Sequence, residues 1–168
     1  NLTRSDTLKI PKTCPICGSQ TEIVKDNDTE VLRCTNPGCK GKLLGQLVNY
    51  VSRKGADIEG LSEESLSKFI SWGWISNVPD TYKLPEHFEE LKNKEGFGEK
   101  SFQNLMDSLE RSRHTTLPRV IYSLGISNIG LANAKVLCRE YGYDLDSLRS
   151  AGAEDLSRIP GIGEVIGA

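Results

Sequence analysis

Apolar runs long enough to cross a membrane are missing from this 168-residue sequence, since a spanning helix needs roughly 20 such residues and no run here exceeds a few. There is no positively charged start followed by an apolar stretch, so we expect no signal peptide. The net charge of −2 excludes a generally basic coat for nucleic acid, although it allows local basic patches. No Ser/His/Asp arrangement and no paired carboxylates stand out, so no catalytic residue is assigned.

Cysteine is also scarce, with five residues, four of which lie between positions 14 and 39. An odd number of cysteines without a signal peptide argues against a disulfide framework and indicates a reducing compartment, here the cytoplasm. The fifth, Cys138, lies in the apolar helical segment "AKVLCREY", where we expect a small core residue.

The four clustered cysteines form two short pairs, in "TCPICGSQ" and "LRCTNPGCKG", with sixteen residues between the pairs. Two such pairs on separate turns can place four thiolates about 2.3 Å from one Zn²⁺, and four thiolates leave no open position for catalysis. We therefore predict one structural zinc ion, held by Cys14, Cys17, Cys34 and Cys39. Four ordinary buried cysteines or a redox C-x-x-C pair are the alternatives.

The segment between the pairs, "TEIVKDNDTEVLR", has the pattern of a strand, a polar turn at 26–28 and a second strand. We expect Pro15 and Gly18 to shape the first turn, and Pro37 and Gly38 the second, so that backbone amides can approach the sulfur atoms. We expect residues 13–42 to form a small zinc finger with a short β-hairpin, and residues 1–12 to be a tail or linker.

After the cysteines, "GKLLGQLVNYVSRKG" places five apolar residues on one helical stripe, and Gly55 is a plausible end of this helix. A weak repeat then follows in the segments "IEGLSEESL", "KEGFGEKSF", "ISNIGLANA" and "IPGIGEVIG". The last small residues of their cores, Ser62, Gly98, Gly130 and Gly163, are spaced by 36, 32 and 33 positions. A period in this range indicates one supersecondary unit used several times.

Each unit is predicted to be a helix, a tight hairpin and a second helix. The preceding helical runs of the second to fourth units are "PEHFEELKN", "LPRVIYSLG" and "AEDLSRI", and the following runs of the first to third units are "SEESLSKFISW", "EKSFQNLMDSLERSR" and "LANAKVLCREYG". Pro85 and Pro118 suit the first turns of two of the preceding helices, and the helix after Gly98 has one apolar face. The predicted fold class is therefore mainly α, with four tandem helix-hairpin-helix units in residues 43–168 preceded by the four-Cys zinc finger.

The turns have a small-hydrophobic-small pattern that suits the binding of an anion. Glycine tolerates the left-handed backbone of a tight turn, and Asn128 is the next most tolerant residue type. The second glycine leaves room above the unpaired N–H groups of the next helix, which attract phosphate. The predicted DNA-binding residues are Gly96, Phe97, Gly98, Lys100, Asn128, Ile129, Gly130, Gly161, Ile162 and Gly163. Ser62 departs from the pattern and is better explained as a helix N-cap.

Two other interpretations stay open for this region. The repeats could form an architectural or protein-interaction scaffold, which the charge of −5 on residues 54–168 favours, against +3 on residues 1–53. Trp72 and Trp74 could stack on bases, but packing in the core is the simpler interpretation. DNA affinity of the chain discriminates between a scaffold and a DNA-binding module.

A four-Cys module, a helix and four helix-hairpin-helix units, in this order, resemble the C-terminal half of the bacterial NAD-dependent DNA ligase family. The segments "CPICG", "CTNPGC" with the following "KGKLLGQLVNYVSRKGADIEGLSEESL", and "SLGISNIGLANAKVL" carry the resemblance, which runs from about Lys12 to the end. The resemblance implies a whole enzyme with a nucleotidyltransferase domain, an OB-fold, these two modules and a BRCT domain. Residues 1–12 would then be the tail of the OB-fold or the linker after it.

The resemblance also implies a function and its partners. The whole enzyme seals nicks with NAD, and this part would hold double-stranded nicked DNA by its phosphates, without sequence preference, beside the other domains of the ligase chain. NAD and magnesium would serve only the whole enzyme, because the K-x-D-G motif with the lysine nucleophile does not occur here. We therefore expect this chain to be monomeric, inactive alone, and a fragment that stops inside the second helix of the fourth unit.

Overall fold

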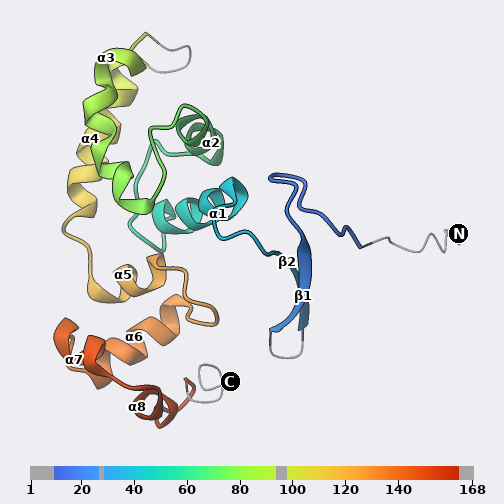
Figure 1. Ribbon diagram of the computed structural model, residues 1–168. Helices are drawn as coiled ribbons and strands as arrows, with labels where there is room; N and C mark the ends of the chain where they lie inside the picture. The colour runs from blue at the N-terminus through green and yellow to red at the C-terminus, as the bar shows by residue number, and fades with distance from the viewer. Residues whose placement is uncertain (1–9, 27–28, 94–97, 163–168) are drawn as a thin grey trace, which may run out of the picture. The chain divides into compact units, whose positions relative to one another are not determined.

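The computed structural model describes residues 10–26, 29–93 and 98–162, and these residues form two compact units, Asn1–Lys42 and Leu43–Ala168. Figure 1 labels the elements of both units. The first unit contains strands β1 (Thr21–Asp26) and β2 (Thr29–Cys34), and the second contains most of helix α1 (Lys40–Val51). The mainly helical fold with one β-hairpin confirms the predicted fold class.

The strands β1 and β2 pair in antiparallel fashion, with Thr21 opposite Cys34 and Ile23 opposite Leu32. Both apolar members of the second pair are exposed, Ile23 by 49% and Leu32 by 39%. Among the described residues of this unit, Cys14 and Cys39 are the buried ones. A unit this small with so little apolar burial needs another source of stability, such as a metal ion.

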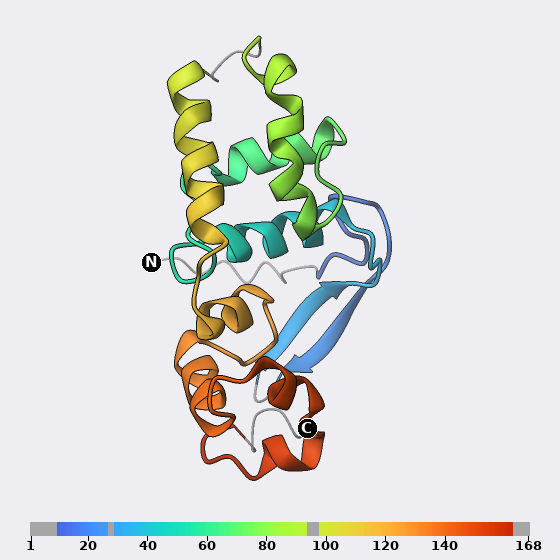
Figure 2. The same ribbon diagram turned by 90° about the vertical axis from the view of Figure 1, so that its left-hand side faces the viewer.

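The second unit continues after α1 with a chain of short helices. They are α2 (Glu63–Ser71), the 3-10 helix η1 (Val78–His87), α3 (Phe88–Leu91), α4 (Glu99–Ser112), α5 (Leu117–Ser123), α6 (Leu131–Glu140), α7 (Leu145–Ser150) and α8 (Ala153–Ser157). Figure 2 shows α1 to α4 gathered at one end of this unit and α5 to α8 at the other. Among the described residues, no helix is both long and apolar enough to cross a membrane.

Two apolar clusters stabilise the second unit. The larger one joins α1 to α4 around Leu47, Leu66, Phe69 and Leu105, and the smaller one joins α5, α6 and α8. Cys138 is fully buried in the smaller cluster, as predicted for a core residue.

Polar contacts connect the two clusters. The Asn49 side chain on α1 donates to the carbonyl oxygen of Tyr122 at 3.1 Å, at the end of α5. The Arg119 guanidinium on α5 donates to the carbonyl oxygen of Arg53 at 2.8 Å and lies 3.7 Å from Asp57. These contacts fix α5, and the loop after it, against α1.

The aromatic residues between α2 and α3 pack against the larger cluster. Trp74 lies between Phe69, at 5.7 Å between ring centroids, and His87, at 4.5 Å with nearly parallel rings. Trp72 packs on Trp74 at 4.8 Å and keeps 36% of its surface exposed. Core packing is thus the structural role of Trp74.

Two local predictions are wrong. Pro85 lies inside η1, because the Asn77 side chain caps that helix eight residues earlier and Pro79 occupies the first turn. Gly55 is not where α1 stops, since the helix ends at Val51. Gly55 is instead required by close packing, because a Cβ there would lie 2.5 Å from the carbonyl oxygen of Tyr50. Helix α7, capped by Asp144, has no counterpart among the predicted segments.

Asp80 is a buried charged residue that links the start of η1 to the loop before it. Its carboxylate accepts from the Ser76 backbone N–H at 3.0 Å, the Ser76 hydroxyl at 2.7 Å and the Lys83 ammonium at 2.9 Å. The Lys83 ammonium and the two donors of Ser76 hold the pKa of Asp80 well below its usual range. These bonds therefore stabilise the fold while the carboxyl group is ionised.

We expect Asp80→Asn to lower the Tm by a few degrees at neutral pH. The contribution of Asp80 is complete above the unfolded-state pKa of about 4 and is lost as the pH falls through the lower folded-state value. The difference in Tm between the two proteins should thus be constant above about pH 5 and narrow below about pH 4. Thermal unfolding across a pH series measures this, with Asp146→Asn at an exposed position as the control. Equal Tm values at pH 7 would contradict the assignment.

Candidate metal centre and nucleic-acid interface

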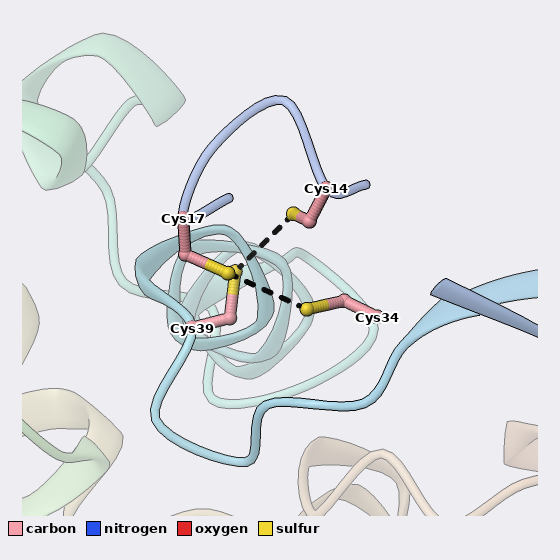
Figure 3. Close-up of side chains that lie close together, drawn as sticks. All are labelled: Cys14, Cys17, Cys34 and Cys39. Carbon is pink, nitrogen blue, oxygen red and sulfur yellow. Dashed lines mark hydrogen bonds between the residues drawn. The ribbon is translucent and has the colours of Figure 1, made fainter. Parts of the chain in front are cut away.

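The four clustered cysteines come together at one end of the β-hairpin. Cys14 and Cys17 lie in the loop before β1, Cys34 is the last residue of β2, and Cys39 immediately precedes α1. Figure 3 shows the four side chains pointing toward one another. The Cys14 and Cys39 sulfur atoms are 3.8 Å apart and those of Cys17 and Cys34 are 3.5 Å apart. All four lie within 4.8 Å of one another.

These distances suit a tetrahedral metal ion. Four sulfur atoms about 2.3 Å from a central ion lie about 3.8 Å from one another. The cluster can therefore hold one metal ion, and the soft sulfur donors favour zinc over hard cations.

The local backbone explains why the cysteines converge. The carbonyl oxygen of Cys14 accepts from the Gly18 N–H at 2.9 Å, and Gly18 has a φ of +72°, which favours glycine. In the second knuckle, the Asn36 side chain accepts from the Gly38 N–H at 2.9 Å, which bends the chain toward Cys39. The predicted roles of Gly18 and Gly38 in shaping the two turns agree with this geometry.

The thiols differ in how readily they ionise. Hydrogen bonds from the hydroxyl and backbone N–H of Ser19 lower the pKa of Cys17 to about 6, and backbone N–H groups lower the pKa of Cys14. Burial raises the pKa of Cys34 to about 11. A cation in the centre would favour the thiolate form of Cys34 as well, so metal binding would release protons.

In the first repeat, the start of the helix is capped by a side chain of the protein itself. The Ser62 hydroxyl is the N-cap of α2 and accepts from the Ser65 backbone N–H at 3.2 Å. One backbone N–H of the first turn of α2 therefore already has a side-chain acceptor, in agreement with the prediction that Ser62 is a cap.

The second and third repeats differ from the first in this respect. Gly98 begins α4 and Gly130 begins α6, both with extended backbone and with no side chain capping the first turn. In the part of the chain that the structure describes, a Cβ at either glycine would meet no atom within 4 Å other than those of its chain neighbours. Among the described residues the fold therefore does not require glycine at these positions, and no side chain caps the N–H groups of either first turn.

The third hairpin is the best defined. Asn128 has a φ of +63°, as predicted for a left-handed turn residue, and Ile129 is buried behind the turn. The first turn of α6 contains no acidic residue. The first turn of α4, in contrast, contains Glu99 beside the exposed Lys100, so its net charge is neutral.

The fourth hairpin is described only in part. Gly161 has a φ of +81° and Ile162 is 1% exposed, so the turn and its hydrophobic plug have the predicted form. Gly96, Phe97 and Gly163 lie outside the described residues, so the structure does not test their predicted roles.

The prediction of the site from sequence missed two groups of residues. Asn49 positions the third hairpin through its bond to Tyr122, and a lone polar residue on an apolar helix face was its only signal. Leu124 and Ile126 in the α5–α6 loop are exposed by 56% and 45%, although they are apolar. A glycine in the middle of α1, Gly45, lies opposite them and was a readable signal in the sequence.

Comparison with known proteins extends this description. The family model "Helix-hairpin-helix motif" matches residues 119–168. Over 166 residues, or 99% of this chain, the sequence is 49% identical to a DNA ligase of Lachnoclostridium phytofermentans, of which it covers 25%. The same share of the chain is 40% identical to a DNA ligase of Ruminiclostridium cellulolyticum, again covering 25% of it. A DNA ligase of Psychrobacter arcticus is 40% identical over 96% of the chain, which covers 23% of that relative.

These matches extend over both the four-Cys unit and the helical unit. The chain spans about a quarter of the length of the curated relatives it matches. The resemblance to the bacterial DNA ligase family is therefore confirmed over nearly the whole chain, which corresponds to a segment of those ligases.

Proposed function

We propose that this chain binds duplex DNA through its backbone phosphates, without sequence preference, as part of an NAD-dependent DNA ligase acting at nicks. The observation that carries this proposal is the pair of uncapped helix starts at Gly98 and Gly130, whose glycines the fold does not require. Helix N-termini attract anions through free N–H groups and the helix dipole. The resemblance to DNA ligases makes DNA phosphate the relevant anion.

The hairpins are proposed to bind phosphate with different strengths. The first turn of α6 contains no acidic residue, so the third hairpin is proposed as the stronger phosphate site. Lys100 offsets Glu99 at the start of α4 and adds a mobile cation to the second hairpin. Gly161 and Ile162, in the fourth hairpin, belong to a third proposed site of the same kind.

The metal is proposed to be zinc with a structural role. Four thiolates fill its coordination shell, so it would hold the two knuckles and the hairpin together rather than take part in a reaction. In the whole ligase, which we propose to act in the bacterial cytoplasm, other domains would use NAD and magnesium for nick sealing. This chain would bind the DNA, and it would do so as a monomer.

A salt series tests the proposal. The affinity of the chain for a nicked duplex should fall by about tenfold to fortyfold between 50 and 200 mM salt, as expected for two or three phosphate contacts. Fluorescence anisotropy with two duplexes of unrelated sequence measures both the salt slope and the absence of sequence preference. Absence of binding at low salt, or an affinity that salt does not change, would refute the phosphate grip.

The second candidate is an architectural or protein-interaction module. The charge of −5 on residues 54–168 favours it, because an acidic surface repels DNA at long range. The same titration separates the two candidates, since a scaffold would not bind the duplex at 50 mM salt.

A further inference from the structure

A groove with a volume of about 500 Å³ lies between α1 and the loop that joins α5 to α6. Gly45 and Gln46 line it from α1, and Leu124, Gly125, Ile126 and Ile129 line it from the loop. It is continuous with the third hairpin, because Ile129 belongs to both and Gly130 is the next residue. Phosphate binding at the third hairpin does not explain why the other residues of this groove are present.

Gly45 is the first unusual feature of this groove. It lies in the middle of α1, where glycine is among the least favourable residues for helix formation. Among the described residues, a Cβ at this position would meet no atom within 4 Å beyond its chain neighbours and the backbone of α1, so the fold would accept alanine and gain helix stability. Glycine at this position therefore leaves space for a molecule that binds against the outer surface of α1.

The two apolar side chains opposite Gly45 are the second feature. Leu124 and Ile126 keep 56% and 45% of their surface exposed, on either side of Gly125. Gly125 has a φ of +67°, and the Asn49 side chain anchors the loop through the carbonyl oxygen of Tyr122. The two exposed apolar side chains are thus held in place on an anchored loop.

We infer that this groove receives the sugar–phosphate strand next to the phosphate held at Gly130, with deoxyribose against Leu124 and Ile126 and the strand passing close to Gly45. Sugar carbons present an apolar face to side chains of the protein, and contacts to phosphate and sugar set the register of a protein on the duplex. The inference rests on the proposed function, because it extends the contact of the third hairpin with DNA onto α1.

The first test substitutes Gly45 in the 168-residue chain. Gly45→Ala should raise the Tm, since alanine is the best helix former, yet weaken binding to a nicked duplex by about threefold. Gly45→Gln keeps a good helix former but fills the groove, and should weaken binding by about tenfold or more. If Gly45 had only a structural role, a variant with a higher Tm would not be expected to bind DNA more weakly.

The second test removes the apolar contact. The double variant Leu124→Ser with Ile126→Ser should lower the affinity by about tenfold at every salt concentration with an unchanged salt slope, because apolar contacts release no counterions. Leu145→Ser is the matched control, since Leu145 is also exposed, by 50%, but lies on α7 away from the groove. It should bind DNA like the natural chain.

The outcomes separate this inference from the proposed function. If Gly98→Thr with Gly130→Thr abolishes binding while Gly45→Gln and the double serine variant bind normally, the groove does not contact DNA and the inference fails alone. If the natural chain does not bind DNA, both fail. If the double serine variant changes only self-association in sedimentation velocity, the groove is a contact between copies, and the inference is overturned.

Discussion

Replacing Gly98 and Gly130 together with threonine is expected to weaken binding to a nicked duplex by about a hundredfold without unfolding the chain. Threonine is about as favourable as glycine at a helix N-cap, and the extended backbone at both positions accepts it. Among the described residues, and apart from its two chain neighbours, no atom lies within 4 Å of a Cβ added at either position. The substitution therefore changes only what approaches these helix starts from outside.

The size of the effect follows from the bonds that are lost. Each threonine would place its methyl group where a phosphate binds and would cap an N–H group with its own hydroxyl. A hydrogen bond to a charged group contributes about 1.5–3 kcal/mol, and 1.4 kcal/mol corresponds to a factor of ten. Each substitution should thus cost about tenfold, with the larger loss at Gly130, whose helix has no acidic residue in its first turn.

The first repeat supplies the matched control. Ser62→Gly converts its capped turn into one like the second and third, and should lower the Tm slightly with no loss of DNA affinity. Measurement requires anisotropy titrations at one salt concentration and thermal unfolding of the same samples. An unchanged affinity of the double threonine variant would show that the hairpins are scaffolding.

Metal removal is expected to have the second large effect, confined to the first unit. The natural chain should contain about one zinc ion, and a chelator should remove the protection of backbone amides in residues 13–42 against hydrogen exchange. The cause is the small apolar burial of this unit, in which Ile23 and Leu32 are exposed. Amides of the larger apolar cluster around Phe69 should keep their protection.

Two cysteine variants distinguish a metal site from general destabilisation. Cys39→Ser removes a buried member of the cluster and should abolish metal binding. Cys138→Ser places a hydroxyl in the buried core of the second unit, so it should lower the Tm but keep the metal. A chain that folds fully without metal, or a Cys39→Ser variant that still binds the metal, would contradict the proposed structural metal site.

The positions where glycine and asparagine shape tight turns, and where serine caps a helix, could be predicted from the sequence. Local chemistry decides these cases, as for the left-handed Asn128, the knuckle of Gly18 and the cap of Ser62. The pairing of the two strands followed from a polar turn between two β-rich runs.

Features that depend on contacts between distant segments could not be predicted. Gly55 looked like the end of a helix. Glycine is required there instead because the carbonyl oxygens of Asn49 and Tyr50 leave no space for a Cβ. The Asn77 cap of η1 overrode the preference of Pro85 for a first turn. The groove between Gly45 and the exposed pair Leu124 and Ile126 required the fold, because those residues lie on segments about 80 positions apart.

The most direct test of the phosphate grip is a nuclear magnetic resonance titration of the chain with a nicked duplex, followed through its backbone amides. We expect the largest chemical-shift changes at residues 98–101 and 130–133, where no side chain caps the first turns of α4 and α6. Amides at the start of α2, where Ser62 provides the cap, should change little. Shifts that spare residues 98–101 and 130–133 while the duplex is bound would contradict the account.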